Sequence, residues 1–97
     1  MSGRLLSRAV AASRPEFVLG DSAQIGSKPG IEVELSAPGV AGVHATIVRE
    51  SDNVWLVDAT HSQSLGVFLN GRRVQRERLQ NLDVITIAGI DLVFLEQ

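Results

Sequence analysis

Apolar and polar residues alternate along most of the chain in short runs, which are separated by Gly, Pro, Asn, Asp and Ser. Such alternation is typical of a strand with one face on a core and the other in solvent, whereas helical periodicity is almost absent. The pattern predicts nine strand segments, at residues 4–10, 16–20, 23–27, 31–35, 44–50, 53–59, 66–75, 83–89 and 90–96. Segments at this spacing favour an all-β fold, an antiparallel β-sandwich of two twisted sheets.

Two positions in the chain predict tight turns between neighbouring strands. Asn70-Gly71 lies between apolar runs, and both central residues of a type I′ hairpin turn need a positive φ, which Asn and Gly tolerate best. A second tight turn is expected at residues 88–91. No internal repeat or linker interrupts the pattern, so residues 1–97 are expected to form a single domain.

Length and composition agree with one small folded domain. The chain has 97 residues, of which 44% are hydrophobic and 21% charged, as in ordinary globular domains with one modest core. No apolar run reaches the roughly 20 residues of a membrane helix, so we expect no membrane contact and a cytoplasmic location. The last expected strand ends one residue before Gln97, which suggests a domain excised from a longer protein.

The residue types narrow the possible chemistry. The chain has no cysteine, which excludes disulfides, thiol nucleophiles and thiolate metal sites. Its two histidines, His44 and His61, lack the spacing of metal ligands, and we expect neither a metal nor a cofactor. The formal net charge is −2, so the chain lacks the basic excess of a nucleic-acid binder, and no nucleic acid is expected as a partner.

Positive charge gathers locally, at Arg72, Arg73, Arg76 and Arg78. We interpret this cluster as a solvated hairpin edge and the connection after it, where charge discourages edge-to-edge pairing of sheets. The alternative is a docking patch for an acidic partner or for nucleic acid. Trp55, which lies in an alternating run, is expected to be a core or half-buried residue.

An enzyme would need a nucleophile, a base and an orienting group, and the sequence DATHSQS at residues 58–64 is the one local concentration of such side chains. It contains Asp58, His61, Ser62 and Ser64. Catalytic triads are assembled in space and not along a short loop, and no nucleophile-elbow motif is present. We therefore predict that the domain is not an enzyme.

Several short motifs follow one another in a characteristic order. Ile25-Gly26-Ser27 ends an early predicted strand, and Val40-Ala41-Gly42-Val43-His44 precedes a later one. Next come a strand ending at Asp58, the pair Leu65-Gly66, the hairpin Leu69-Asn70-Gly71, and a tail with Leu79, Asp83, Ile85, Ile87 and Phe94. In order and spacing, over almost the whole chain, these motifs resemble the forkhead-associated (FHA) domain, a β-sandwich family that reads phosphothreonine.

The departures from the family pattern fall on the residues that contact phosphate in the family. Ser27 stands where the family has arginine, Ala41 where it has the pocket serine, Gly42 where it has a second arginine, and Leu65 where it has asparagine. Leu82 and Ala88 replace two glycines of the tail. The resemblance implies that the matching residues belong to the scaffold that shapes the loops; they are Gly26, His44, Gly66, Asn70 and Gly71.

His44 is expected to be structural. A single histidine among apolar neighbours is most often a partly buried residue whose two ring nitrogens hydrogen-bond to nearby backbone or hydroxyl groups. The resemblance implies the same role, because the family's histidine braces the loops around the binding surface.

The expected function is that of a non-catalytic protein interaction module, in signalling or in an assembly scaffold. Its candidate binding residues lie in the loops at one end of the sandwich; they are Ser27, Lys28, Ala41, Gly42, Ser62, Gln63, Ser64 and Leu65. The favoured hypothesis is binding of a protein or peptide without phosphothreonine recognition. Two others stay open: phosphothreonine binding through substitute donors at Ser27, Lys28, Ser62 and Ser64, or a structural or oligomerisation domain of a larger complex.

Overall fold

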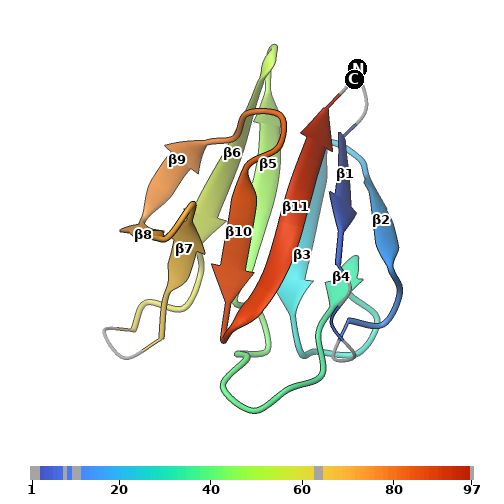
Figure 1. The fold of residues 1–97 in the computed structure, drawn as a ribbon, viewed down its shortest axis with the longest axis vertical. Helices are drawn as coiled ribbons and strands as arrows, with labels where there is room; N and C mark the ends of the chain where they lie inside the picture. The colour runs from blue at the N-terminus through green and yellow to red at the C-terminus, as the bar shows by residue number, and fades with distance from the viewer. Residues whose placement is uncertain (1–2, 8, 10–11, 63–64, 97) are drawn as a thin grey trace.

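The computed structural model describes residues 3–7, 9, 12–62 and 65–96. Over these residues the chain forms two twisted sheets that pack face to face (Figure 1). The six-stranded sheet has the order β2-β1-β11-β10-β7-β8, and the five-stranded sheet has the order β4-β3-β5-β6-β9. No helix is found in the described part of the chain, and hence none that could cross a membrane. The predicted all-β sandwich is confirmed.

The strands follow the predicted segments closely. They are β1 (Gly3–Leu6), β2 (Glu16–Leu19), β3 (Ser22–Gly26), β4 (Val33–Glu34), β5 (Ala45–Glu50), β6 (Asn53–Asp58), β7 (Val67–Leu69), β8 (Arg72–Val74), β9 (Arg76–Arg78), β10 (Val84–Ile87) and β11 (Ile90–Glu96). Neighbouring strands pair antiparallel with one exception among the described pairs, β3 with β4, which run parallel.

The structure differs from the sequence prediction at three strands. β1 ends at Leu6 and not at residue 10, because Ser7 N already donates to Pro15 O in the turn toward β2. β4 has only two residues, Val33–Glu34, which pair parallel with Ile25 and Gly26 of β3. β9 was expected to be a connection. Its sequence, Arg-Glu-Arg, has no apolar residue to mark a strand, yet it pairs with β6 at the edge of the sheet.

Alternate residues of both sheets fill the core. The largest side chains buried completely include Leu5, Phe94, Leu92 and Ile85 from the six-stranded sheet and Ile25 and Leu56 from the five-stranded sheet. Burying one such side chain stabilises the fold by about 1.5–3 kcal/mol. This core fixes the strand register, because a slip by one residue would turn each buried side chain to solvent.

Both predicted tight turns are present. Asn70 and Gly71 have φ of 52° and 84°, and Ala88 and Gly89 have φ of 51° and 80°. The side chain of Asn70 adds a second function, since its Nδ2 donates to Asp83 Oδ1 at 3.0 Å and its Oδ1 accepts from Val84 N at 2.9 Å. Asn70 therefore ties the β7–β8 hairpin to the start of β10.

Leu82 and Ala88 both occupy left-handed backbone positions, with φ of 74° and 51°. These are the two places where the family pattern has glycine. A residue with a Cβ in this conformation costs roughly 1–2 kcal/mol relative to an unstrained backbone. The chain therefore accepts local strain at two turns that glycine would relieve.

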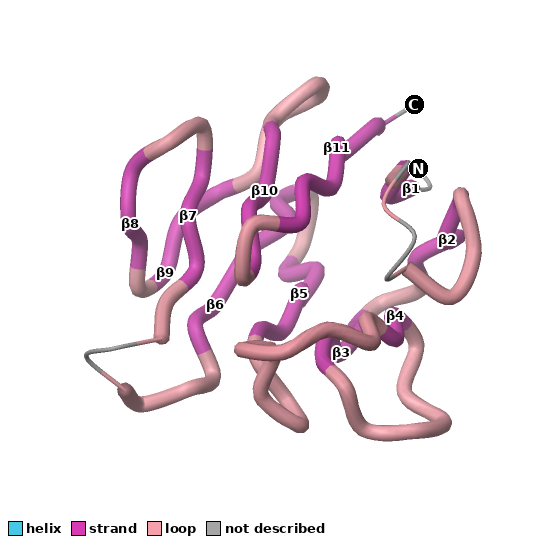
Figure 2. The backbone as a smooth tube through the Cα atoms, turned by 60° about the horizontal axis from the view of Figure 1, so that its bottom comes forward, coloured by secondary structure: helices cyan, strands magenta, loops and turns pink. Residues whose placement is uncertain are grey.

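The connections gather at two opposite ends of the sandwich. The β3–β4, β4–β5 and β6–β7 loops lie at one end, the lower end in Figure 1, and Figure 2 shows this end turned toward the viewer. The β5–β6 turn and both chain termini lie at the other end. Because loops at one end of a rigid sandwich can vary without disturbing the core, we call this set the apical loops and look there for function.

Replacement of Ala88 by Gly should raise the free energy of unfolding by about 1 kcal/mol, because glycine removes the strain of the positive φ. Chemical denaturation measures the change. The matched control is Ala37→Gly, at a loop alanine outside the positive-φ residues, which should lower stability by about 0.4–1 kcal/mol. Equal effects of the two substitutions would contradict the strained geometry of the β10–β11 turn.

Candidate functional site

The first two apical loops, residues 27–32 and 36–43, are joined by backbone hydrogen bonds. Ser27 N donates to Ala41 O at 2.9 Å, and Lys28 N donates to Gly42 O at 3.1 Å. The hydroxyl of Ser27 donates to Val40 O at 3.1 Å. These contacts extend the pairing of the five-stranded sheet beyond the end of β3 and hold the two loops as one unit.

Gly26, the last residue of β3, permits this close approach. A Cβ built at Gly26 would lie 2.1 Å from the carbonyl oxygen of Gly42, a distance that no real Cβ can accept. Gly26 is also buried, and its own carbonyl accepts from Leu35 N at 2.8 Å. The position requires glycine for space.

His44 connects the second apical loop to the third, residues 59–66. Its ring is 1% exposed. Nδ1 accepts a hydrogen bond from Ala41 N at 3.0 Å, so Nε2 carries the proton and donates it to Gly66 O at 2.9 Å. The backbone of His44 makes two more bonds, with N donating to Ile25 O and O accepting from Ala59 N. The ring thus connects the two loops through hydrogen bonds of both its nitrogens.

In the described part of the third apical loop, short polar side chains bond to nearby groups of the chain. Asp58 is 8% exposed and accepts two hydrogen bonds from Thr60, from N at 2.7 Å and from Oγ1 at 2.6 Å. Further along, Ser62 Oγ accepts from Leu65 N at 3.2 Å. Such bonds from short polar side chains to nearby backbone define compact loops.

Arg73 is a loop-shaping residue that sequence reasoning missed. It lies on β8, and its Nη2 donates to Ser62 O at 2.6 Å and to Leu65 O at 2.5 Å. Gly66 makes room for it, because a Cβ at Gly66 would lie 3.0 Å from Arg73 Nε. Within the sequence Arg73 was one of four clustered arginines. Only the pairing of β7 with β8 brings it beside the third loop.

The other three arginines point elsewhere. Arg76 lies over the Trp55 ring, 4.3 Å from its centroid, and its Nη2 contacts Glu50 Oε1 at 2.7 Å. Trp55 is half-buried on the outer face of the five-stranded sheet, as expected. Arg72 and Arg78 are exposed on edge strands. The cluster is divided between two sheets, with Arg72 and Arg73 on β8 and Arg76 and Arg78 on β9.

The candidate binding residues share one end of the molecule but differ in accessibility. Lys28 and Gly42 are exposed, whereas Ser27, Ala41, Ser62 and Leu65 are half-buried. Gln63 and Ser64 lie outside the described residues. No described residue forms an ion pair with Lys28.

The DATHSQS segment does not assemble a catalytic triad in its described part. The carboxylate of Asp58 is engaged by Thr60, and His61 is exposed with φ of 53°. An orienting carboxylate would have to bond the histidine instead. No group of three or more potential metal ligands occurs among the residues described.

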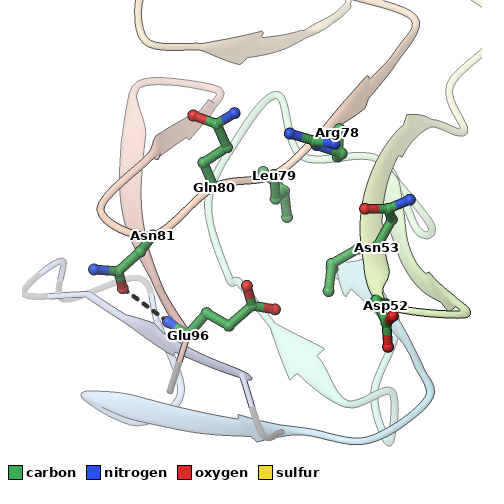
Figure 3. A pocket seen from close by; sticks show the side chains of 8 residues that line it. Asp52, Asn53, Arg78, Leu79, Gln80, Asn81 and Glu96 are labelled. Atoms are coloured by element: carbon green, nitrogen blue, oxygen red, sulfur yellow. Dashed lines mark hydrogen bonds between the residues drawn. The ribbon is translucent and has the colours of Figure 1, made fainter.

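A polar cavity of about 330 Å³ lies at the end of the sandwich opposite to the apical loops (Figure 3). Its lining includes Asp52, Arg78, Asn81 and Glu96. Asn81 Oδ1 accepts from Glu96 N at 2.9 Å, and the Glu96 carboxylate lies 3.7 Å from Arg49 Nη1. Glu96 N and Asn81 are thus paired with each other, whereas Glu96 Oε2 is buried without a hydrogen-bond partner among the described residues. None of the candidate binding residues that the structure describes lines this cavity.

Comparison with known families agrees with this geometry. The model of the FHA domain matches residues 23–88, which include the three apical loops and His44. The chain belongs to the FHA domain family.

Solved FHA domains share its architecture over nearly their whole length. One, from a structural and functional analysis of phosphothreonine-dependent FHA domain interactions, is 23% identical with a TM-score of 0.87, and the match covers 100% of this chain and 98% of that one. The FHA domain of the CT664 protein from Chlamydia trachomatis is 22% identical with a TM-score of 0.85, covering 100% and 99%. The FHA domain of FhaA, complexed with the intracellular domain of Rv3910, is 24% identical with a TM-score of 0.83, covering 96% and 99%. No curated protein matched by sequence.

The bracing histidine of this FHA domain should contribute measurably to stability. His44→Ala removes two hydrogen bonds and leaves the buried Gly66 carbonyl unpaired, so the free energy of unfolding should fall by about 1–3 kcal/mol. The control, His61→Ala, removes an exposed ring and should change stability by no more than about 0.5 kcal/mol. Denaturant unfolding of both variants measures the difference; similar losses would contradict the bracing role.

The close contact at Gly26 gives a second stability test for the FHA domain. Gly26→Ala forces the first two apical loops apart and should cost about 1–3 kcal/mol, as for other overpacked positions. Gly42→Ala is the matched control, because a Cβ there has no atom within 4 Å. Its effect should stay within about 0.5 kcal/mol. A tolerated Gly26→Ala would mean that the loops are not joined as described.

Proposed function

We propose that this FHA domain is a non-catalytic interaction module whose apical loops bind a protein or peptide without reading phosphothreonine. FHA domains are interaction modules that typically bind phosphothreonine peptides. In this proposal the domain is still an interaction module that binds through its apical loops. Its ligand is a protein or peptide that need not be phosphorylated.

The lack of side-chain donors at three of the positions where the family pattern has them carries the proposal. A phosphothreonine dianion loses water on binding and needs charge-assisted hydrogen bonds in return, best supplied by an arginine fork and a hydroxyl. Ala41, Gly42 and Leu65 stand at three of the positions where the family pattern has such donors, and none has a polar side chain. The fourth is Ser27, whose hydroxyl already donates to Val40 O.

The remaining surface suits a neutral ligand better than a dianion. In the apical loops Val40, Ala41 and Leu65 are half-buried, and Gly42 is exposed. Arg73 is occupied with the carbonyls of Ser62 and Leu65, where it shapes the third loop. An unphosphorylated peptide could contact apolar side chains and backbone groups here without the cost of desolvating a phosphate.

Lys28 favours a second candidate, phosphate binding through substitute donors. Its side chain is exposed at the apical end and makes no ion pair with a described residue. A related structure comes from work on phosphothreonine-dependent FHA interactions. However, an ammonium is a flexible, strongly hydrated point charge without the fork geometry of arginine, and it should recover only part of the lost affinity.

A phosphothreonine peptide library and its unphosphorylated counterpart, titrated against the domain by fluorescence anisotropy, separate the two candidates. Each charge-assisted hydrogen bond contributes about 1.5–3 kcal/mol, so losing three donors weakens a micromolar site, near −8 kcal/mol, to millimolar or worse. We expect no difference between the two libraries.

A variant with the family's donors restored tests whether the phosphate-contacting positions of the family have been assigned to the correct residues of this chain. Ser27→Arg combined with Ala41→Ser and Leu65→Asn returns three donors and should create phosphate-dependent binding. Lys28→Ala in the unchanged domain is the control for the second candidate. Tight phosphate-dependent binding by the unchanged domain, abolished by Lys28→Ala, would refute the proposal and establish the substitute donors.

A further inference from the structure

Strand β9 forms a free edge of the five-stranded sheet. It pairs with β6 on one side, and no described strand pairs with it on the other (Figure 1). The opposite edge strand, β4, is partly covered, because Ser13 N donates to Glu34 O at 3.1 Å and Ala12 forms a bridge with Leu35. A free edge presents unpaired N–H and C=O groups to other chains. In this sheet, β9 is the more open edge.

The pairing with β6 decides which backbone groups of β9 point outward. Gln75 O accepts a hydrogen bond from β6 at 2.9 Å, and Leu79 N donates one to β6 at 2.7 Å. In an antiparallel pair, residues that bond to the partner strand alternate with residues whose N–H and C=O point away from it. Glu77 therefore bonds to β6 as well, whereas the N–H and C=O groups of Arg76 and Arg78 point toward the free edge.

The side chains of β9 alternate in charge between the two faces of the sheet. Arg76 and Arg78 are exposed on the outer face, where Trp55 lies, and Glu77 is half-buried on the inner face. Arg76 stacks on the Trp55 ring at 4.3 Å and contacts Glu50 at 2.7 Å, which orients its guanidinium, yet its side chain is 54% exposed. Neither Glu77 nor Arg78 forms an ion pair with a described residue. The edge thus presents the charge order plus, minus, plus.

This charge order disfavours a second copy of β9 as the partner. In an antiparallel pairing of two β9 strands centred on Glu77, Glu77 faces Glu77, and Arg76 of each strand faces Arg78 of the other. Like charges would then lie directly opposite each other at all three positions, which destabilises a strand pair. The repulsion removes one wrong partner, and the opposite charge order is the one that the edge accepts.

We propose that β9 binds an extended segment of a partner protein with the charge order acidic, basic, acidic, which extends the sheet as an antiparallel edge strand. The two acidic residues lie opposite Arg76 and Arg78 and exchange N–H···O bonds with both. Their carboxylates meet the two guanidinium groups on the outer face, and the basic residue between them faces Glu77 on the inner face. β9 lies along the side of the sandwich, so this surface is separate from the apical loops (Figure 1).

Titration of three synthetic peptides against the domain tests the charge order. The peptides share Thr-Val and Val-Thr flanks around a central Glu-Lys-Glu, Glu-Glu-Lys or Lys-Glu-Lys. Trp55, the one tryptophan of the chain, reports binding by its fluorescence, because it lies beside both arginines of β9. Glu-Lys-Glu should bind about tenfold more tightly than the other two, which place like charges opposite each other. Equal affinities of Glu-Lys-Glu and Glu-Glu-Lys, or no saturable binding of Glu-Lys-Glu at millimolar peptide, would overturn the proposal.

Backbone methylation of the Glu-Lys-Glu peptide tests the strand pairing without any change to the domain. An N-methyl group on either glutamate removes an N–H that bonds to β9 and should weaken binding by about tenfold or more. The same group on the lysine is the matched control, because the N–H of that residue points away from β9. It should change the dissociation constant by less than about threefold. Equal losses at all three positions would mean that charge alone holds the peptide, and would contradict the added strand.

Charge reversal on the domain locates the site. The combined variant Arg76→Glu, Glu77→Lys and Arg78→Glu should bind the Lys-Glu-Lys peptide more tightly than Glu-Lys-Glu, the reverse of the unchanged domain. Arg72→Glu is the matched control, because it makes the same change of charge on β8 and should keep the original preference. Anisotropy of fluorescein-labelled peptides measures both variants, and thermal melting verifies that they are folded. A folded reversed variant that still prefers Glu-Lys-Glu would refute β9 as the binding edge.

Discussion

The ring of His44, buried and neutral, holds the apical end of the sandwich together. One nitrogen accepts from Ala41 in the second loop and the other donates to Gly66 in the third, while the first loop joins the second through Ser27 and Lys28. All three loops are thereby fixed relative to the core. A rigid support of this kind allows the exposed side chains of the loops to change without loss of the fold.

The residues that hold the apical loops in place differ from the residues that would contact a ligand. This difference explains why the chain has the family's residues at some positions and not at others. Gly26, His44 and Gly66 are present because space and hydrogen bonding demand them. At three positions where the family has phosphate donors, the support uses backbone groups: Ala41 N donates to His44, and the carbonyls of Gly42 and Leu65 accept from Lys28 N and Arg73. The side chains of Ala41, Gly42 and Leu65 are therefore compatible with the same loop geometry. Arg73 adds a brace from β8, which fixes the third loop through two of its carbonyl groups.

Most of the fold could be predicted from the sequence because its signals are local. Alternation located the core strands, and Asn70-Gly71 located a hairpin. β9 was missed because Arg-Glu-Arg has no apolar alternation and pairs only through its edge position next to β6. The role of Arg73 was missed for a related reason, since its contact with residues 62 and 65 depends on how β8 returns beside β7. The hydrogen bond from the Ser27 hydroxyl to Val40 O could not be predicted either, because it depends on how the first two apical loops pack against each other.

We propose that the apical loops keep their support in this domain without forming a phosphate site. Amide chemical shifts report it directly, because Ser27, Lys28, Ala41 and Gly42 each have a backbone N–H at the apical end. In a titration with free phosphothreonine, followed by two-dimensional nitrogen-15 NMR, these four amides should show no saturable shift, while the amide of Ala41 keeps its hydrogen bond to His44. Saturable shifts confined to these amides, at micromolar ligand, would contradict the account.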